Sequence, residues 1–369
     1  MNKRTYFITG GGTGGHIYPA VAVADELLKD ETTEKIYYVG NPENLEATIV
    51  KDKNYEFLPV KSSGMPRKIN LELVNWAFKM FIAWLKCCTY IKKYKPDVIF
   101  GTGGYVSAPV ILAGITMKVP FIMHDCDANP GLVTRKLSPY AKSISIAFED
   151  ARKKLHNKNC HLNGNPVRTE FKTLTKTQAR KNLNLEDKLT LCIMGGSQGA
   201  KTINNAAVDI LKELSQCYNL QIIFQTGKRN YEETITKLEK IYPEYKDNKN
   251  ILIRPYFEDM ATVLKACDIA VSRAGSLSIS ELCASAIAPI FIPYPYAAAD
   301  HQRKNAKCMV QSGAGLYLED SETTPDTLKN LLKELLDTPE KLQEIQEASL
   351  KLAKFDGVQK IVEQIKTAV

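Results

Sequence analysis

Residues 6–16 read YFITGGGTGGH, a short apolar run that ends in a glycine-rich turn. The amphipathic segment at residues 20–28 follows it, so strand, glycine loop and helix succeed one another. A second apolar strand at residues 35–39 completes a βαβ unit. This alternation predicts a parallel sheet with helices on both faces and right-handed crossovers. Helical patterns separate several further strands, which we predict at residues 56–60, 97–100, 120–123 and 143–147.

The same pattern restarts after a cluster of turn-forming residues at 161–166. A strand at residues 189–194 leads into the glycine loop GGSQGA (residues 195–200) and then into a helix at residues 201–214. Later strands are predicted at residues 220–225, 251–254, 269–272, 289–292 and 315–318. We therefore expect two Rossmann-like domains, residues 1–164 and 165–354, with a final helix at residues 355–369 that returns to the first domain.

The composition is that of an ordinary globular protein, with 44% hydrophobic and 24% charged residues among 369. The sequence has no run of 18 apolar residues and no export signal near its start. Nine cysteines without CxxC spacing suggest neither a zinc site nor a disulfide framework, and so a reducing cytosol. The positive charge is concentrated before Asn163, with 22 basic against 15 acidic residues, compared with 27 against 26 afterwards.

Residues 71–85 form a predicted helix that is apolar nearly all round and contains both tryptophans, Trp76 and Trp84. Such a helix is either buried in the core or partly exposed as a membrane-docking face. Flanking basic residues, among them Arg67 and Lys68, favour the second interpretation slightly. The predicted membrane contacts are Trp76, Phe81 and Trp84.

The first glycine loop satisfies the dinucleotide-binding pattern G-x-G-x-x-G, but this match alone is weak. That fold expects an acidic residue at the end of the second strand, where residues 39–42 offer none and Glu43 is displaced. His16 instead closes the loop at a helix start, where the helix dipole favours a neutral imidazole suited to a general base. Its alternative role is that of a capping or packing histidine.

Two more polar turns follow strands of the first domain, at residues 103–107 and 124–131. Loops at the carboxyl edge of an open α/β sheet line the ligand crevice, so His16, Tyr105 and Asp127 are expected to converge.

In the second domain, residues 195–199 can present backbone N–H groups and the Ser197 hydroxyl to a diphosphate without a metal. Arg168 can clamp the same phosphates with its planar fork, and Arg273 is a weaker candidate. Residues 275–281 open a helix whose Glu281 either complements the helix dipole or contacts a ligand.

Six motifs now stand in order: GGTGGH (11–16), GTGGY (101–105), NGNPVR (163–168), GGSQGA (195–200), RAGSLSISE (273–281) and DHQRKNA (300–306). Together they closely resemble the MurG family of N-acetylglucosaminyltransferases of peptidoglycan synthesis, in glycosyltransferase family 28. The resemblance covers essentially the whole chain. It implies an α/β protein of GT-B fold, in which two Rossmann-like domains with parallel sheets face a central cleft.

The resemblance also implies a reaction, the inverting transfer of GlcNAc from UDP-GlcNAc to the C4 hydroxyl of MurNAc in undecaprenyl-diphospho-MurNAc-pentapeptide (lipid I), which gives lipid II. No cofactor or divalent metal is expected. The implied partners are UDP-GlcNAc, lipid I, anionic inner-leaflet lipids and other cell-wall synthesis proteins, but no nucleic acid. The implied location is the cytoplasmic face of the cell membrane, with lipid I bound by the first domain and the donor by the second.

By resemblance, His16 is the catalytic base. The acceptor-binding residues are Gly14, Gly15, Gly103, Gly104 and Tyr105. The donor-binding residues are Thr13, Gly14, Gly15, Asp127, Arg168, Ser197, Phe257, Arg273, Glu281 and Gln302. Asp127 stands where many members of the family carry Asn and others carry Asp, and Cys126 beside it is unusual for the family.

Three other functions share parts of this pattern. A UDP-GlcNAc 2-epimerase and a diacylglycerol glycosyltransferase can share the fold and the donor loop. A non-catalytic nucleotide-sugar-binding subunit that anchors a partner to the membrane is the alternative from another class.

Overall fold

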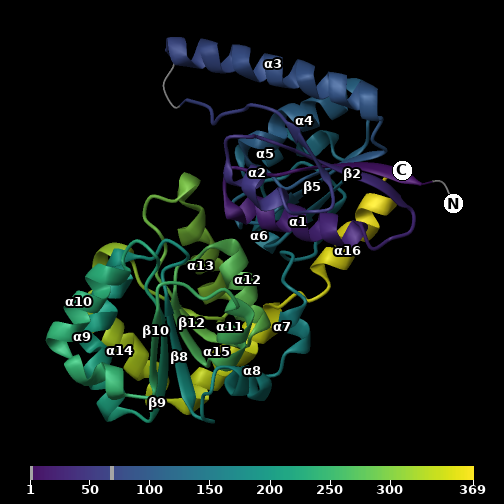
Figure 1. The fold of residues 1–369 in the computed structure, drawn as a ribbon. Coiled ribbons are helices and arrows are strands. Elements are labelled where there is room, and N and C mark those ends of the chain that lie inside the picture. Colours follow the sequence, from purple (N-terminus) through teal and green to yellow (C-terminus); the bar gives the residue numbers. More distant parts are fainter. Residues whose placement is uncertain (1–2, 67–69) are drawn as a thin grey trace. The chain divides into compact units, whose positions relative to one another are not determined.

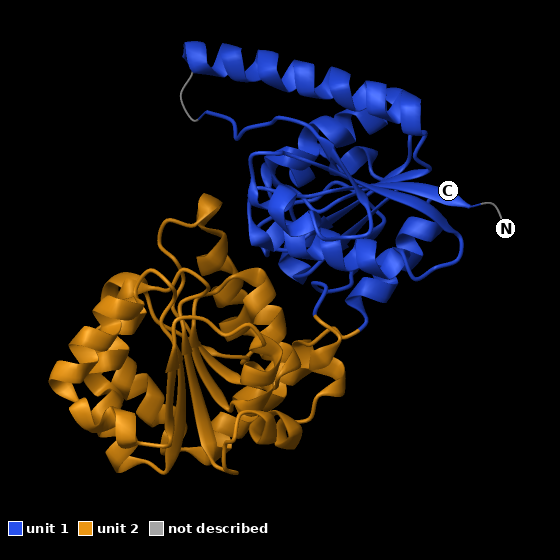
Figure 2. Cartoon of the chain, viewed as in Figure 1, with its two compact units in different colours: residues 1–167, 356–369 blue, residues 168–355 orange. Residues whose placement is uncertain are grey.

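The computed structural model describes residues 3–66 and 70–369, so Arg67 and Lys68 lie outside the described residues. The chain divides into two compact units (Figure 2). Unit 1 comprises Met1–Val167 together with Asp356–Val369, and unit 2 comprises Arg168–Phe355. Each unit contains its own parallel sheet, as the alternating pattern predicted.

The sheet of unit 1 has seven parallel strands in the order β3-β2-β1-β4-β5-β6-β7 (Figure 1). Their bounds are β1 Arg4–Thr9, β2 Thr33–Gly40, β3 Glu56–Pro59, β4 Val98–Gly101, β5 Phe121–Asp125, β6 Ser143–Ile146 and β7 Cys160–Leu162. All of them except β7 were predicted, with ends that differ by up to two residues. β7 has only three residues, one of them exposed, and so carries too short an apolar signal.

Successive side chains of β1 point to opposite faces of this sheet and so divide its core in two. Tyr6 and Ile8 pack with α1 (Gly14–Leu27) and α16 (Gly357–Lys366), whereas Phe7 packs on the side of α3 (Leu71–Tyr94) and α4 (Gly104–Met117). The sheet is therefore covered on both faces. The shorter helices of unit 1 are α2 Leu45–Val50, α5 Leu132–Leu137, η1 Ser138–Tyr140 and α6 Glu149–Arg152.

The last helix of the chain, α16, packs against α1 of unit 1 (Figure 1). Ile361 and Ile365 are fully buried there, among residues of the first sheet. Asn163 Nδ2 donates a 2.8 Å hydrogen bond to Gln364 Oε1 on the same helix. Unit 1 is thus built from two segments that lie far apart in the sequence.

The sheet of unit 2 has six parallel strands in the order β10-β9-β8-β11-β12-β13. The strands are β8 Leu189–Met194, β9 Leu220–Gln225, β10 Ile251–Arg254, β11 Ile269–Ser272, β12 Ala288–Phe291 and β13 Leu316–Tyr317. The first four begin and end at the predicted residues, because each is an apolar run bounded by polar or turn-forming residues.

One face of this second sheet packs against α9, α10 and α14 (Figure 1). The helices of unit 2 are α7 Glu170–Thr173, α8 Lys176–Asn182, α9 Lys201–Cys217, α10 Tyr231–Ile241, α11 Met260–Ala266, α12 Ser276–Ala284, α13 His301–Gln311, α14 Pro325–Leu336 and α15 Pro339–Leu352. Short 3-10 turns lie at Pro243–Asp247, Ala298–Asp300 and Asp320–Glu322.

Helix α3 is not a core helix, because only Ala83, Cys87 and Ile91 of its 24 residues are buried. Its tryptophans are only half-buried, and their indole N–H groups donate to Ser63 O (Trp76, 2.8 Å) and Thr116 Oγ1 (Trp84, 3.2 Å). The outward apolar face instead consists of Leu71, Val74, Phe78, Phe81, Ile82 and Leu85. In residues 3–66 and 70–369, no helix has the length and apolar character needed to cross a bilayer.

Candidate active site

In each unit, the strand order reverses beside the first strand of the sheet, which is β1 in unit 1 and β8 in unit 2. A glycine loop follows each of these strands and leads into a helix. Ligands of open α/β sheets bind outside the carboxyl ends of the strands at such a switch point. Both predicted glycine loops therefore lie where the fold places a binding site.

His16 is the third residue of α1, directly after the first glycine loop. Its Nδ1 lies 3.1 Å from Thr13 Oγ1, and Thr102 Oγ1 donates a 2.6 Å hydrogen bond to its backbone oxygen. A Cβ placed on Gly103 would lie 3.3 Å from the imidazole ring, as would one on Gly104. The structure thus brings His16 together with Thr13 and with the Gly103–Gly104 turn.

Tyr105 lies beside the same glycine loop, since a Cβ on Gly12 would approach its ring to 3.1 Å. Its hydroxyl accepts a 2.9 Å hydrogen bond from Asn44 Nδ2, a contact that the sequence did not reveal. Asn44 Nδ2 also donates a 3.3 Å hydrogen bond to Glu46 Oε1, a carboxylate oxygen of a residue with no exposed surface. Sequence reasoning found no acidic residue at this loop, because Glu46 comes back to it from α2 rather than from the end of β2.

The loop after β5 contains two buried titratable residues with opposite properties. Burial lowers the pKa of His124 to about 4, and the charges of His16 and Asp127 add smaller opposing shifts. Burial also raises the pKa of Asp125 to about 7, with a further contribution from Asp127. His124 and Asp125 are therefore both uncharged over much of the acidic range. Asp127 itself is half-buried, and its N–H donates to Asp125 Oδ1 at 3.2 Å.

Hydrogen bonds fix the ring of His124 on both sides. Ser145 Oγ lies 3.0 Å from Nδ1, and Asn165 Oδ1 lies 3.1 Å from Nε2. Because an amide oxygen only accepts, Nε2 must carry the proton and Nδ1 must accept. This network joins the end of β5 to the segment at residues 163–167 that ends the first part of unit 1.

The glycine loop of unit 2 is exposed at Gly196, Ser197 and Gln198. Across the described part of the chain, the backbone N–H groups of Ser197 and Gln198 make no hydrogen bond. Gln225, which the sequence did not single out, donates from Nε2 to Gly196 O at 3.3 Å and accepts from Phe257 N at 2.9 Å. Its amide therefore links this loop to the buried Phe257.

Arg168 and Glu281 form an ion pair with 3.1 Å between Nη2 and Oε1. Burial raises the pKa of Glu281 above the ordinary carboxyl value, although the charge of Arg168 opposes this rise. Glu281 is the sixth residue of α12, which places it in the second turn. Glu281 thus lies about a turn and a half from the helix start, where the dipole effect is weak because it is confined to the first turn.

The two polar segments that follow β11 and β12 contact each other. Asn305 Nδ2 donates to Ala274 O at 3.3 Å, next to the start of α12. Gln302 Oε1 accepts a 3.0 Å hydrogen bond from Tyr294 N, which fixes its side chain at the beginning of α13. Arg273 is held inside unit 2, because its Nη1 donates to Ile292 O at 3.0 Å and to Asp320 Oδ1 at 2.5 Å.

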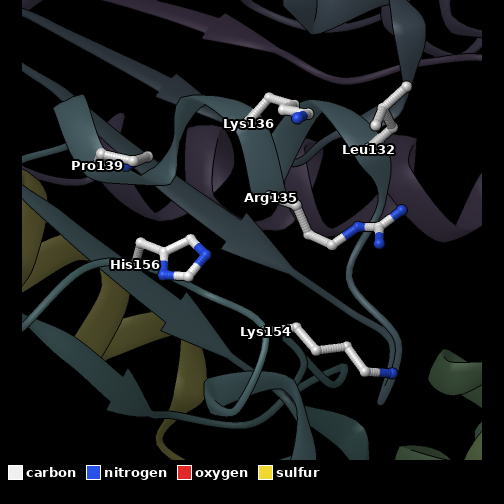
Figure 3. Close-up of a pocket in the computed structure, with 6 residues that line it drawn as sticks. All are labelled: Leu132, Arg135, Lys136, Pro139, Lys154 and His156. Atoms are coloured by element: carbon white, nitrogen blue, oxygen red, sulfur yellow. The ribbon is translucent and has the colours of Figure 1, made fainter.

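A basic pocket of about 390 Å³ lies on unit 1 beside α5 (Figure 3). Its lining residues are Leu132, Arg135, Lys136, Pro139, Lys154 and His156. Neighbouring Arg152 and Lys153 are paired with Glu149 and Asp150. By contrast, none of the three pocket cations forms an ion pair with any residue that the structure describes. The pocket therefore carries uncompensated positive charge.

The predicted donor-binding residues are divided between the units. Thr13, Gly14, Gly15 and Asp127 belong to unit 1, whereas Arg168, Ser197, Phe257, Arg273, Glu281 and Gln302 belong to unit 2. Among the described residues, no three acidic, histidine or cysteine side chains gather in a group that could hold a metal ion. The nine cysteines are free thiols, and six of them are buried.

Comparison with known proteins identifies the class of this fold. Residues 6–146 match the glycosyltransferase family 28 N-terminal domain, and residues 190–365 match the glycosyltransferase family 28 C-terminal domain. Each matched domain contains one of the two glycine loops, so the chain is a two-domain glycosyltransferase.

A Desulforamulus reducens protein, UDP-N-acetylglucosamine–N-acetylmuramyl-(pentapeptide) pyrophosphoryl-undecaprenol N-acetylglucosamine transferase, is 38% identical over 96% of this chain and 96% of its own. The crystal structure of Acinetobacter baumannii MurG has a TM-score of 0.79 and 27% identity over 99% of both chains. The chain belongs to the family of these N-acetylglucosamine transferases, and the GT-B fold is confirmed.

A UDP-GlcNAc 2-epimerase from Neisseria meningitidis is also similar in fold, with a TM-score of 0.67 over the whole of both chains. Its sequence identity is only 13%, so the likeness extends to the fold alone.

Proposed function

We infer that this chain transfers GlcNAc from UDP-GlcNAc to lipid I and so forms lipid II in peptidoglycan synthesis. It is a UDP-GlcNAc-dependent N-acetylglucosaminyltransferase. The observation that carries this conclusion is the 38% identity to a transferase of that name over 96% of both chains. The two glycine loops at the switch points give the chemistry a place in the fold.

On unit 1, His16 acts as the general base. It takes the proton from the C4 hydroxyl of the acceptor while that oxygen forms a bond to C1 of GlcNAc. The bond from C1 to the diphosphate oxygen breaks, UDP leaves with the electron pair, and the configuration at C1 inverts. The support for His16 is its position at the start of α1, with Thr13 Oγ1 3.1 Å from Nδ1 and the Gly103–Gly104 turn against its ring.

On unit 2, the open amides at Ser197 and Gln198 receive the phosphates of UDP together with Arg168. Arg168 Nη2 donates to Glu281 Oε1, and the guanidinium also lies over the ring of Phe171, with 5.3 Å between Cζ and the ring centroid. Glu281 holds the ribose, Gln302 reads the GlcNAc hydroxyls, and Phe257 lies by the uracil.

For Phe257 and Arg273 the hydrogen bonds inside unit 2 restrict what remains available. The Phe257 N–H already donates to Gln225 Oε1, so the carbonyl oxygen of Phe257 is the backbone group left to bind uracil. The Arg273 guanidinium is bound to Asp320 and to two carbonyl oxygens, so we assign it to holding the loop before α13. No metal takes part in this proposal.

The decisive experiment incubates the purified protein with UDP-GlcNAc and a short-chain lipid I analogue. Release of UDP together with a disaccharide product supports transfer. A free sugar isomer would point to epimerisation, and no turnover would point to a binding subunit. Transfer of GlcNAc to diacylglycerol, supplied in a parallel reaction in place of lipid I, would point to the other transferase.

We also propose that unit 1 docks on the cytoplasmic face of the membrane. The exposed apolar face of α3 offers Phe78 and Phe81, which are 63% and 52% exposed. The basic pocket of Figure 3 supplies unpaired cations for anionic lipid. Burying an apolar face and pairing cations with anionic headgroups both strengthen membrane binding.

The docking test uses vesicles of phosphatidylglycerol and phosphatidylcholine in equal parts. Phe78→Ser with Phe81→Ser should reduce sedimentation with the vesicles. The matched control, Leu350→Ser with Leu352→Ser, removes two exposed apolar side chains from α15 of unit 2 and should not. Equal loss in both pairs would reject α3 as the docking face. The half-buried tryptophans are poorer probes, because their replacement also breaks hydrogen bonds inside unit 1.

A further inference from the structure

Glu46 is a buried carboxylate at the base of the first glycine loop, and nothing in the proposed function uses it. It has no exposed surface and lies in the first turn of α2. Its Oε2 accepts a 3.3 Å hydrogen bond from Gly12 N, and its Oε1 accepts from Asn41 N at 3.2 Å and from Asn44 Nδ2 at 3.3 Å. A buried carboxylate is costly unless such donors compensate it.

No lysine, arginine or histidine forms an ion pair with Glu46 in the part of the chain that the structure describes. The carboxylate is held by N–H groups alone, two of them from the backbone. Such a carboxylate restricts the conformation of the groups that donate to it, because each N–H that turned away would leave the buried charge less stabilised.

The donors to Glu46 come from separate segments around the candidate acceptor site. Gly12 belongs to the loop after β1, and Asn41 and Asn44 belong to the segment after β2. Asn44 Nδ2 also donates to the Tyr105 hydroxyl at 2.9 Å, which brings in α4. Glu46 is thus the common anchor of three elements.

The glycine loop has been shaped around this carboxylate. A Cβ on Gly11 would lie 2.5 Å from Glu46 Oε1, so no larger residue fits there without displacing it. On the other side, the Tyr38 hydroxyl donates a 2.6 Å hydrogen bond to Gly10 O. The loop is therefore fixed from both ends just before Thr13, whose Oγ1 lies 3.1 Å from His16 Nδ1.

We propose that Glu46 is a positioning residue for the transfer reaction, which holds His16 and Tyr105 in register on the acceptor side without touching substrate. This inference rests on the proposed function. Its physical basis is that a displacement of about 1 Å in a catalytic group can lower the rate by about 100-fold.

The test is Glu46→Gln, which keeps the volume of the side chain but directs an NH₂ group at an N–H donor. We expect kcat to fall by about 100-fold. The KM for UDP-GlcNAc should stay within about twofold, because most of the donor-binding residues lie in unit 2 and do not contact Glu46. The matched control is Glu43→Gln, an exposed carboxylate of the same segment that pairs with Lys61 at the surface. It should leave both constants unchanged.

A second pair of variants separates positioning from simple stability. Asn44→Ala leaves Glu46 and its two backbone donors in place but removes the Asn44 donor and the link to Tyr105, so it should lower kcat in protein that circular dichroism shows to be folded. Adding Asn44→Asp to Glu46→Gln returns a carboxylate to the cluster, and we expect it to recover part of kcat.

Wild-type protein in the same assay separates the two proposals. Absence of transfer by the wild type would overturn the proposed function. Wild-type transfer with an unchanged kcat in Glu46→Gln, or a loss no larger than the unfolded fraction measured by circular dichroism, would overturn the positioning role. If Glu46→Gln does not fold, Asn44→Ala decides the matter by the same criterion.

Discussion

The two glycine loops share one sequence pattern but differ in what lies beneath them. In unit 1, the buried carboxylate of Glu46 takes the Gly12 N–H. In unit 2, the neutral side-chain amide of Gln225 donates a hydrogen bond to the carbonyl oxygen of Gly196. The backbone N–H groups of Ser197 and Gln198 have no partner in the described part of the chain. In the loop of unit 1, a backbone N–H group is therefore already bound to a carboxylate of the protein itself. In the loop of unit 2, the backbone N–H groups face outward.

This difference indicates how one supersecondary unit serves two purposes. Outward amides at a helix start suit the phosphates of a nucleotide donor. A loop fixed on a buried carboxylate suits a site that must hold a base and an acceptor hydroxyl in line. The strand–loop–helix pattern alone does not distinguish the two, because the deciding side chains come from other elements.

The largest effect should come from His16→Ala in unit 1. Loss of a general base lowers kcat by about 10²- to 10⁴-fold, with little change in the KM for UDP-GlcNAc. Steady-state kinetics across pH with the lipid I analogue provides the measurement. A variant that turned over at the wild-type rate at every pH would remove His16 as the base and with it the assignment of chemistry to unit 1.

A smaller effect, of a different kind, is expected from Arg168→Ala in unit 2. The loss of one charge-assisted donor to the leaving group should cost about 2–4 kcal/mol of transition-state stabilisation. It should also raise the KM for UDP-GlcNAc, since the proposed function has Arg168 bind the donor both before and during reaction. Lys240→Ala, which removes a charge from the exposed side of α10, is the control. An effect on the acceptor KM instead would reverse the assignment of the two units.

Two glycines of the second loop allow backbone strain and close contact to be separated. Gly196 and Gly199 have φ values of +84° and +80°, so alanine is strained at both by about 1 kcal/mol. Only at Gly199 would the new Cβ also meet a backbone atom, Thr226 O at 2.1 Å. Calorimetry should therefore show Gly199→Ala to be the less stable variant by a further 1–3 kcal/mol, roughly. Equal stabilities would mean that this loop is not held against β9.

A further effect concerns the pH dependence of stability and the loop after β5. The depressed pKa of His124, near 4 instead of 6.5, lowers stability as the pH falls from 6.5 to about 4. The raised pKa of Asp125, near 7 instead of 3.8, lowers stability as the pH rises from 3.8 to about 7. Their slopes oppose each other between about pH 4 and 6.5.

Asp125→Asn removes one of these slopes and should make unit 1 lose about 1.4 kcal/mol per pH unit on acidification in that window. Urea unfolding followed by tryptophan fluorescence reports on this unit alone, because Trp76 and Trp84 both lie in it. Asp52→Asn, at an exposed site, should leave the wild-type profile unchanged. A variant profile as flat as that of the wild type would contradict the opposing titrations.

Sequence patterns predicted most of the strands because each core strand is a continuous apolar run bounded by turn formers. β7 escaped because Cys160-His161-Leu162 is short and has its middle residue exposed. At the candidate site, residues that lie within motifs could be named from the sequence, whereas Glu46, Asn44 and Gln225 could not. These three act through contacts with loops far away in sequence, and no local spacing records such contacts.

The closing helix α16 also bears on how the protein is made. Ile361, Val362 and Ile365 belong to the core of unit 1, although unit 2 lies between them and the rest of that core in the chain. During synthesis, unit 2 has all its residues before unit 1 does, because the α16 segment of unit 1 follows unit 2 in the chain. Domains fold as their segments become available. The apolar surface of α1 that α16 covers therefore stays open until residues 357–366 have left the ribosome, so unit 1 completes its core only after unit 2 has been synthesised.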